Sequence, residues 1–432
     1  MPTTPLRTKV HLCVMMFLQF AINGVWSIPL VTYLGELHYS GQQIALAYST
    51  FAWGALLSPV FVGMIADRFF ASQKILAWLN LLGGPLLLLA ALVLATPAGA
   101  PRPIQPWLFF WVLLAHCLCY FPTWSLINSI ALAHVRDAGR EFPLIRLMGT
   151  IGWIVVSMIS LASSTFKFNI EKTVWPLWIG AGLCIATGVY NFFLPHTPPQ
   201  AAGKRVTVGE ILGLRALGLL RDRNFAVLLL TSLLIMLPAA FYWTFCNDFL
   251  NEIGMKAAQF KQSLGQMTEA LFIFLLPIFF LRYLSVKNVF LLGLAAWAAR
   301  YVLLASSTTE DVAIYLALLL HGMCFAFIFV LGPMYTDRKA PKELQASAQG
   351  LLVLVTWGLG QLGGIYLSGK FFDYYELPKP LGGLTHDWRM YWLWAAAMSG
   401  VIVVLFCVLF RDRIDMRPAA AGAPAAPPPG EV

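Results

Sequence analysis

The chain has 432 residues, of which 59% are hydrophobic and only 11% are charged, and its mean hydropathy is +0.73. Soluble domains carry about 25% charged residues, so this composition excludes a water-soluble globular fold and predicts a protein surrounded by lipid. The formal net charge of +9 comes from Lys and Arg that lie mainly between apolar segments. We therefore interpret the charge as a sign of membrane topology and expect no binding to nucleic acid.

Apolar segments of about 20 residues, the length at which a helix crosses the hydrocarbon core, follow one another along the chain. They predict twelve membrane-spanning helices, each bounded by charged residues, Pro or Gly. The predicted helices cover residues 10–34, 43–66, 74–96, 105–133, 142–165, 174–195, 224–250, 260–281, 287–306, 312–334, 344–369 and 388–410. Because the first is too long and too aromatic for a signal peptide, we expect it to stay in the mature protein.

The longest polar stretch between two apolar segments divides the twelve helices into six and six. It is basic and rich in Pro at its start, and we interpret residues 196–223 as a cytoplasmic linker. Residues 1–195 and 224–411 then form an N-terminal and a C-terminal six-helix bundle. Residues 412–432, rich in Ala and Pro, are expected to be a disordered tail. Lys and Arg are concentrated on the side of the termini, which places both termini in the cytoplasm.

Three charged residues stand out in the apolar segments, namely Arg146, Glu269 and Arg300. A charge at the bilayer centre costs about 2.5–3.5 kcal/mol unless it has a partner or a water-filled cavity. Arg146 shares one helix face with Thr150 and Trp153, which follow at i+4 and i+7. This face can hold an oxygen-rich solute and stack on a planar ring. Alternatively, Arg146 reaches the membrane interface and Trp153 faces lipid.

Glu269 lies one turn after Gln266 and one turn before Phe272, some ten residues into the eighth predicted helix. A carboxyl group at this depth is a candidate proton carrier and a hydrogen-bond partner for hydroxyls or ring nitrogens. The alternative is a glutamate that only ties helices together. Arg300 lies near the end of its segment, and we interpret it as a structural anchor.

Four further polar candidates in the apolar segments are two uncharged residues and two lone histidines. Asn128 and Gln19 either line the same cavity or form hydrogen bonds between helices. His116 and His321 are more typical of helix packing than of a proton relay. The seven cysteines show no paired spacing and no metal-ligand pattern, so we expect neither disulfides nor a metal site.

Several stretches resemble one known family. Residues 63–68 read GMIADR, which is similar to the gate motif of the major facilitator superfamily, with Asp67 and Arg68 as the matching gate residues. The longer matches are YFPTWSLINSIAL from Tyr120, FPLIRLMGTIGW from Phe142, GQMTEALFIFLLPIFFLRYLSVKNV from Gly265, WAARY from Trp297 and ASAQG from Ala346. Together they resemble the bacterial nucleoside:proton symporter family of that superfamily, along nearly the whole chain.

The resemblance implies an all-α membrane protein with twelve transmembrane helices in two six-helix bundles. It also implies a solute site between the bundles. It implies that Arg146, Thr150 and Trp153 bind the solute from one bundle and Gln266 and Glu269 from the other. We add Phe325, Asn128 and Gln19 as further candidate binding residues, and Glu269 as the residue that couples transport to protons. The sequence departs from the family pattern where polar groups are expected in the seventh and tenth helices, because it has Ala240, Trp243 and Ala326 there. These departures predict a more apolar and aromatic pocket.

The resemblance further implies a secondary active transporter that imports nucleosides by proton symport through alternating access. Such a protein would be a monomer in the bacterial inner membrane, without a cofactor. One alternative is a facilitator or symporter for another small aromatic or sugar-like solute. Another is a membrane sensor or scaffold that does not transport. We do not expect an enzyme, because the sequence shows no loop-borne nucleophile with its base and no phosphate-binding glycine loop.

Overall fold

The computed structural model describes residues 4–61, 71–95, 105–198, 209, 213–307, 311–381, 384–412 and 414. Over these residues, 10 helices are long and apolar enough to cross a membrane. Two more helices, α3 (Gly41–Phe61) and α8 (Trp175–Asn191), lie at the second and sixth predicted positions. The helices therefore confirm the predicted helical membrane fold. Residues 199–208 and 210–212 of the expected linker, and nearly all of the expected tail, lie outside the described residues.

The remaining elements of the N-terminal bundle include α2, which continues the span begun by α1. They are α1 (Leu6–Trp26), α2 (Leu30–Glu36), α5 (Ser72–Leu94), α6 (Pro106–His134), α7 (Ala138–Thr165) and the short turn η2 (Ile170–Lys172). Pro106 begins α6 at a position where its missing N–H costs nothing. Asp137 caps α7 by accepting a hydrogen bond from the backbone nitrogen of Arg140.

The C-terminal bundle has several segmented helices. Its elements are η3 (Leu214–Arg221), α10 (Arg223–Glu252), α11 (Ala258–Gln262), α12 (Leu264–Leu275), η4 (Leu276–Phe280), α13 (Leu281–Tyr283), α14 (Val286–Ser306), α15 (Val312–Leu319), α16 (His321–Phe325), η5 (Ala326–Val330), α17 (Leu331–Lys339), η6 (Lys342–Leu344), α18 (Gln345–Val353), η7 (Leu354–Gly360), α19 (Gln361–Tyr374) and α20 (Trp388–Leu409). The segments η4, η5 and η7 are π-helical. Pro277 lies within η4 and Pro333 follows η5. Because Pro cannot donate a backbone hydrogen bond, it interrupts the α-helical ladder at these places.

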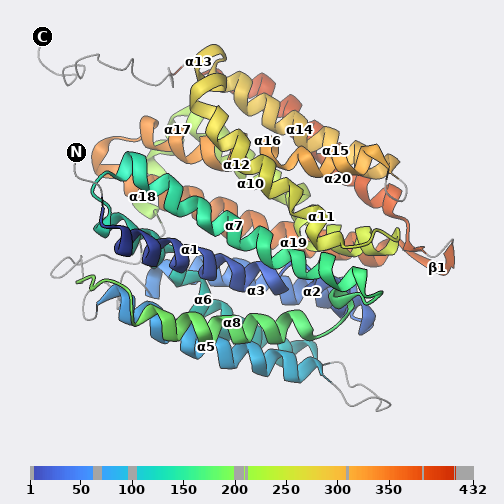
Figure 1. The fold of residues 1–432 in the computed structure, drawn as a ribbon. Helices are drawn as coiled ribbons and strands as arrows, with labels where there is room; N and C mark the ends of the chain where they lie inside the picture. The colour runs from blue at the N-terminus through green and yellow to red at the C-terminus, as the bar shows by residue number, and fades with distance from the viewer. Residues whose placement is uncertain are drawn as a thin grey trace, which may run out of the picture.

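The helices pack into two bundles that lie side by side (Figure 1). In one bundle α1 packs against α7 and α8, and α5 packs against α6 and α8. In the other, α14 packs against α20, and α10 packs against α19 and α20. The two bundles meet where α3 packs against α19 and where α7 packs against α11 and α12. Helices α7 and α12, which carry the expected site residues, therefore face each other across the junction.

The two ends of the molecule are distinct. The start of α1 and the turn between α17 and α18 lie at one end, which we call the termini end (Figure 1). The chain leaves α20 at the same end, where the Arg411 backbone nitrogen donates to the Asn224 side chain at 2.8 Å. Helix α11 and strand β1 lie at the other end, which we call the opposite end (Figure 1).

A short hairpin at the opposite end was not predicted. Strands β1 (Glu376–Leu381) and β2 (Leu384–His386) pair antiparallel between α19 and α20. The hairpin is fastened to α10 by Glu252, which accepts hydrogen bonds from the Thr385 backbone nitrogen at 3.1 Å and the Trp388 indole at 2.7 Å. Such a small hairpin, with two prolines in its first strand, has no alternating apolar pattern that would reveal it in the sequence.

Helices α1 and α7 approach closely at Gly152, and this contact yields a stability prediction. A Cβ atom at Gly152 would lie 2.2 Å from the carbonyl oxygen of Phe17. We therefore expect Gly152→Ala to lower the stability by about 1–3 kcal/mol, because the helices must separate to admit the methyl group. Thermal unfolding of the purified protein in detergent measures this loss. Gly182→Ala is the control, because nothing lies within 4 Å of a Cβ atom there. An equal melting temperature for the two variants would contradict the prediction.

Candidate functional site

Five of the expected binding residues lie on α7 and α12, the two helices that face each other across the junction of the bundles. Arg146, Thr150 and Trp153 on α7, and Gln266 and Glu269 on α12, are all half-buried although they lie inside membrane-spanning segments. Arg146 and Glu269 lie on opposite sides of the junction of the bundles, where α7 packs against α12. No ion pair joins these two residues in the described part of the chain. The structure therefore places the two charges on facing helices without direct contact.

Aromatic rings surround the first-bundle part of this group. The Arg146 guanidinium lies over the ring of Phe20, 4.2 Å from its centroid. Phe20 in turn stacks on Trp124, with a centroid distance of 5.4 Å. The Trp153 ring packs against Gly24 of α1, and its buried indole nitrogen has no hydrogen-bond partner. This part of the site therefore combines a cation, flat rings and an unused donor.

On the second bundle, Glu269 has an unexpected neighbour. Its carboxylate lies 3.6 Å from Nε2 of His321, with the Glu269 side chain 22% exposed and the His321 side chain 4% exposed. The Gln266 amide, in the orientation that satisfies its neighbours, donates to the carbonyl oxygens of Gln262 and Ser263 at 3.2 and 3.3 Å. Glu269 thus lies beside a side chain of another helix, whereas Gln266 donates to backbone carbonyls just before the start of α12.

Arg300 is fully buried and belongs to the same cluster. Its Nη1 lies 3.2 Å from Nδ1 of His321, and its guanidinium carbon lies 3.2 Å from the centroid of the Tyr242 ring. The sequence marked Arg300 as a charge in an apolar segment and His321 as a lone histidine. Only the structure shows that the two meet beside Glu269.

An aromatic cluster occupies the place where polar groups were expected from the family pattern. It consists of Trp243, Phe325, Phe329 and Trp357. Trp243 stacks on Trp357 with a centroid distance of 5.5 Å and an interplanar angle of 19°, and Phe325 lies 5.5 Å from Phe329. All four rings are half-buried. The smaller residues nearby, Ala240 and Ala326, are fully buried. The four rings therefore make this region aromatic and apolar.

The two uncharged candidates occupy different environments. Gln19 is fully buried, donates to the Thr123 hydroxyl at 2.8 Å and accepts from the Asn80 amide at 3.0 Å. This network ties α1 to α5 and α6. Asn128 is half-buried, and its buried side-chain oxygen has no partner. The gate residues Asp67 and Arg68 lie outside the described residues.

A polar network at the opposite end joins the two bundles around Glu171, a residue that the sequence did not single out. Glu171 is 1% exposed. Its carboxylate accepts hydrogen bonds from the side chains of Asn247 and Asn251, at 2.9 and 3.0 Å, and from the Gln259 backbone nitrogen at 3.0 Å. The Ser160 hydroxyl donates a further bond. One loop carboxylate of the first bundle therefore holds α10 and the start of α11.

Further hydrogen bonds join the two bundles at the opposite end. The Gln259 side chain donates to the carbonyl oxygen of Gly24 at 2.7 Å. At the start of α3, the backbone nitrogens of Gly41 and Gln42 donate to the Asp373 carboxylate of α19 at 2.5 and 3.0 Å. The opposite end of the molecule is therefore closed by direct bonds between the bundles.

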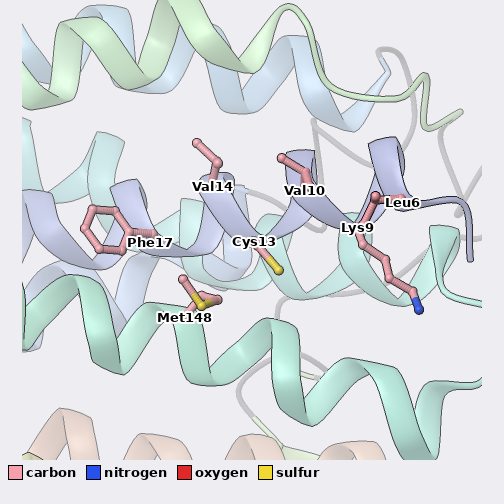
Figure 2. Close-up of a pocket in the computed structure, with 7 residues that line it drawn as sticks. All are labelled: Leu6, Lys9, Val10, Cys13, Val14, Phe17 and Met148. Carbon is pink, nitrogen blue, oxygen red and sulfur yellow. The ribbon is translucent and has the colours of Figure 1, made fainter.

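A separate cavity of about 400 Å³ lies between α1 and α7 (Figure 2). It is lined by Leu6, Lys9, Val10, Cys13, Val14, Phe17 and Met148. None of the expected binding residues lines it, and its wall is almost entirely apolar. It is therefore distinct from the group at the junction of α7 and α12.

Comparison with known proteins gives a consistent result over nearly the whole chain. A family model described as nucleoside H+ symporter matches residues 6–415. The putative nucleoside transporter YegT of Escherichia coli (strain K12) is 41% identical over 417 residues, which cover 94% of this chain and 95% of the relative. The nucleoside permease NupG of the same organism is 29% identical over 424 residues, covering 94% and 96%.

Solved structures agree with these sequence matches. The crystal structure of nucleoside transporter NupG superposes with a TM-score of 0.81 at 28% identity, covering 94% of this chain and 100% of that chain. A bacterial homologue of the human lysosomal transporter Spinster, in an inward-facing and unoccupied conformation, gives a TM-score of 0.70 at 12% identity. It covers 96% of this chain and 98% of that chain, and it supports the fold alone.

Proposed function

The chain belongs to the nucleoside H+ symporter family, and from this premise we propose that it imports nucleosides together with protons. It is a multi-pass membrane transporter and not an enzyme. We place it in the bacterial inner membrane, in keeping with its bacterial relatives, and we propose that it acts as a monomer.

One observation carries the proposal: a cation from one bundle and a carboxyl group from the other lie half-buried at the junction of the bundles. In our proposal Arg146, Thr150 and Trp153 bind the solute from the first bundle, and Gln266 and Glu269 bind it from the second. Glu269 also carries the proton. Solute and proton then share one site, so the binding of one can be coupled directly to the binding of the other.

The other candidates take secondary roles in this proposal. Phe325 and the aromatic cluster contact the flat part of the solute, since aromatic rings stack on planar groups. Asn128 offers its unpartnered oxygen to a donor on the solute. Gln19 acts indirectly, by holding α1 against α5 and α6.

We also propose the direction in which the site opens. With both termini in the cytoplasm, as the distribution of Lys and Arg favours, the Glu171 network lies on the outer side and the structure is closed to the outside. Residues 1–195 and 224–411 would move against each other as two bodies, joined by 196–223, to open that side. Asp67 and Arg68 would close the cytoplasmic side in turn.

A second candidate function is transport of another small aromatic solute. The aromatic cluster favours it, because Ala240, Trp243 and Ala326 replace polar groups that would otherwise bind hydroxyls or base edges. A site that hydrogen-bonds its substrate discriminates strongly on those contacts, and this site has fewer of them.

Uptake into proteoliposomes tests the proposal. We expect labelled uridine or adenosine to accumulate when the outside is acidic, and to equilibrate without accumulating when there is no proton gradient. Absence of uptake of both nucleosides by a protein with a cooperative thermal transition would overturn the nucleoside assignment. Competition by planar heteroaromatic compounds would then favour the second candidate.

A further inference from the structure

Three polar side chains from three helices form a connected row beside the proposed site. Glu269 comes from α12, His321 from α16 and Arg300 from α14. Nε2 of His321 lies 3.6 Å from the Glu269 carboxylate, and Nδ1 of the same ring lies 3.2 Å from Nη1 of Arg300. The imidazole thus stands between a carboxylate and a guanidinium, with one ring nitrogen facing each.

Two glycines make this arrangement possible. A Cβ atom at Gly265 would lie 2.8 Å from Cβ of His321. A Cβ atom at Gly322 would lie 2.4 Å from the backbone of Thr268 and 2.7 Å from the backbone nitrogen of Glu269. Helix α16 therefore approaches α12 more closely than side chains would allow, at the position where His321 reaches Glu269.

The chemistry of arginine fixes the tautomer of His321. A guanidinium can only donate hydrogen bonds, so Nδ1 of His321 must accept from Arg300 and carries no proton. The single proton of a neutral imidazole is then on Nε2, which is the nitrogen that faces Glu269. Arg300 therefore makes His321 a donor toward the carboxylate.

The surroundings of Arg300 are mainly aromatic. Arg300 is fully buried, its guanidinium lies against the rings of Tyr242 and Trp297, and its Nε and Nη2 atoms have no hydrogen-bond partner. It forms no ion pair with any residue that the structure describes. The hydrogen bond from Arg300 to His321 therefore links Arg300 to Glu269. The Glu269 carboxylate is nearby and can balance the positive charge of Arg300.

We propose that Arg300 and His321 are positioning residues that orient the Glu269 carboxylate and thereby set the pH dependence of proton-coupled uptake. This inference deepens the proposed function and rests on Glu269 being the proton carrier. A proton that arrives from water binds to a Glu269 oxygen and neutralises it, while Nε2–H remains on His321. A donor that faces an ionised carboxylate favours the ionised form, so its removal is expected to move the pH dependence of uptake upward.

The groups that face His321 from the packed helices support this assignment. Glu269 faces it from α12, Arg300 from α14, and the Tyr242 ring from α10 at a centroid distance of 5.8 Å. Arg146 lies on α7, which packs against α12 at the junction of the bundles. Among the charged groups in this set, only Arg300 reaches the imidazole by a hydrogen bond.

The test uses two amide substitutions of His321, each of which places a polar group near one of the two ring nitrogens. His321→Asn keeps a polar partner near Nδ1 for Arg300 but is too short to reach Glu269. His321→Gln places an amide N–H near the position of Nε2. Gradient-driven uptake of labelled uridine is measured over a pH series and normalised to the maximum of each variant. We expect His321→Asn to move the half-maximal pH upward by about one unit, and His321→Gln to restore it to within a few tenths of a unit.

His116→Asn is the matched control. His116 is also a fully buried histidine in a membrane-spanning helix, where Nδ1 lies 2.8 Å from the Gly83 carbonyl oxygen, and it lies in the other bundle. Its substitution should leave the normalised profile unchanged.

Other outcomes separate this inference from the proposed function. A His321→Asn profile that superimposes on that of the wild type would overturn the positioning role. Loss of proton coupling in His321→Gln would also overturn it, because His321 would then be a carrier itself. If uptake of uridine by the wild type does not depend on pH, the proposed proton symport is wrong. If His321→Asn does not fold, Arg300→Lys, which keeps the charge and one donor, is expected to shift the profile less than Arg300→Met.

Discussion

Glu269→Gln is expected to abolish gradient-driven accumulation of nucleoside while leaving exchange of nucleoside across the membrane intact. Glutamine has the shape of a protonated glutamate, so the solute can still bind, but the side chain can neither take up nor release a proton. Each pH unit of gradient can drive up to about a tenfold accumulation through one coupled proton, and this driving force is lost entirely. Counterflow of labelled against unlabelled uridine measures exchange, and uptake under an acidic outside measures accumulation.

Glu343→Gln provides the matched control for this experiment. Glu343 lies in η6 at the termini end and its side chain is exposed, so its neutralisation should change neither activity. Accumulation by Glu269→Gln at the level of the wild type would contradict the proton role of Glu269. Loss of both exchange and accumulation in a folded variant would instead assign Glu269 to solute binding alone.

Glu171→Ala is expected to open the side of the transporter that the structure shows closed. The substitution leaves the Asn247 amide and the Gln259 backbone nitrogen without their acceptor, and a buried unsatisfied group costs about 1–3 kcal/mol. Two such groups shift the balance between closed and open forms by about tenfold or more, because 1.4 kcal/mol corresponds to a factor of ten. Transport should fall, since a transporter that rarely closes on this side completes few cycles.

Hydrogen–deuterium exchange measures the opening directly. Exchange of peptides that cover residues 247–259 should rise in Glu171→Ala, and exchange of peptides at the termini end should not. Glu36→Gln is the control at the same end, because Glu36 forms an exposed pair with Lys172 at 2.6 Å, with side chains 45% and 44% exposed. Exposed pairs contribute about 0–1 kcal/mol. Unchanged exchange around Asn247 in Glu171→Ala would contradict the closing role of this network.

The membrane-spanning helices could be predicted because the pattern that reveals each helix lies in its own residues. A run of about 20 apolar residues is required by the thickness of the bilayer, and no partner is needed to recognise it. The same holds for Arg146 and Glu269, since a charge in an apolar segment is costly wherever its partner lies. The ends of the helices are predicted less closely than their positions. Helix α10, for example, extends to Glu252, slightly beyond the predicted end at 250.

The contacts between segments could not be predicted, because they depend on how helices pack. His321 looked like an ordinary packing histidine, and only the close approach of α16 to α12 brings it to Glu269. Glu171 lies in a loop, where an acidic residue is usually solvated, and its burial follows from α10 and α11 closing over it. The hairpin β1–β2 and the π-helical segments likewise depend on local backbone packing. The binding roles of the site residues remain predictions.

The central claim is that nucleoside and proton cross the membrane together, and solute-dependent proton movement tests it most directly. Proteoliposomes that contain a pH-sensitive dye are prepared without any gradient, and uridine is added outside. The account predicts that the lumen acidifies as uridine enters, and that Glu269→Gln vesicles show no acidification. Entry of labelled uridine into wild-type vesicles without any change of luminal pH would contradict the account and identify the protein as a facilitator.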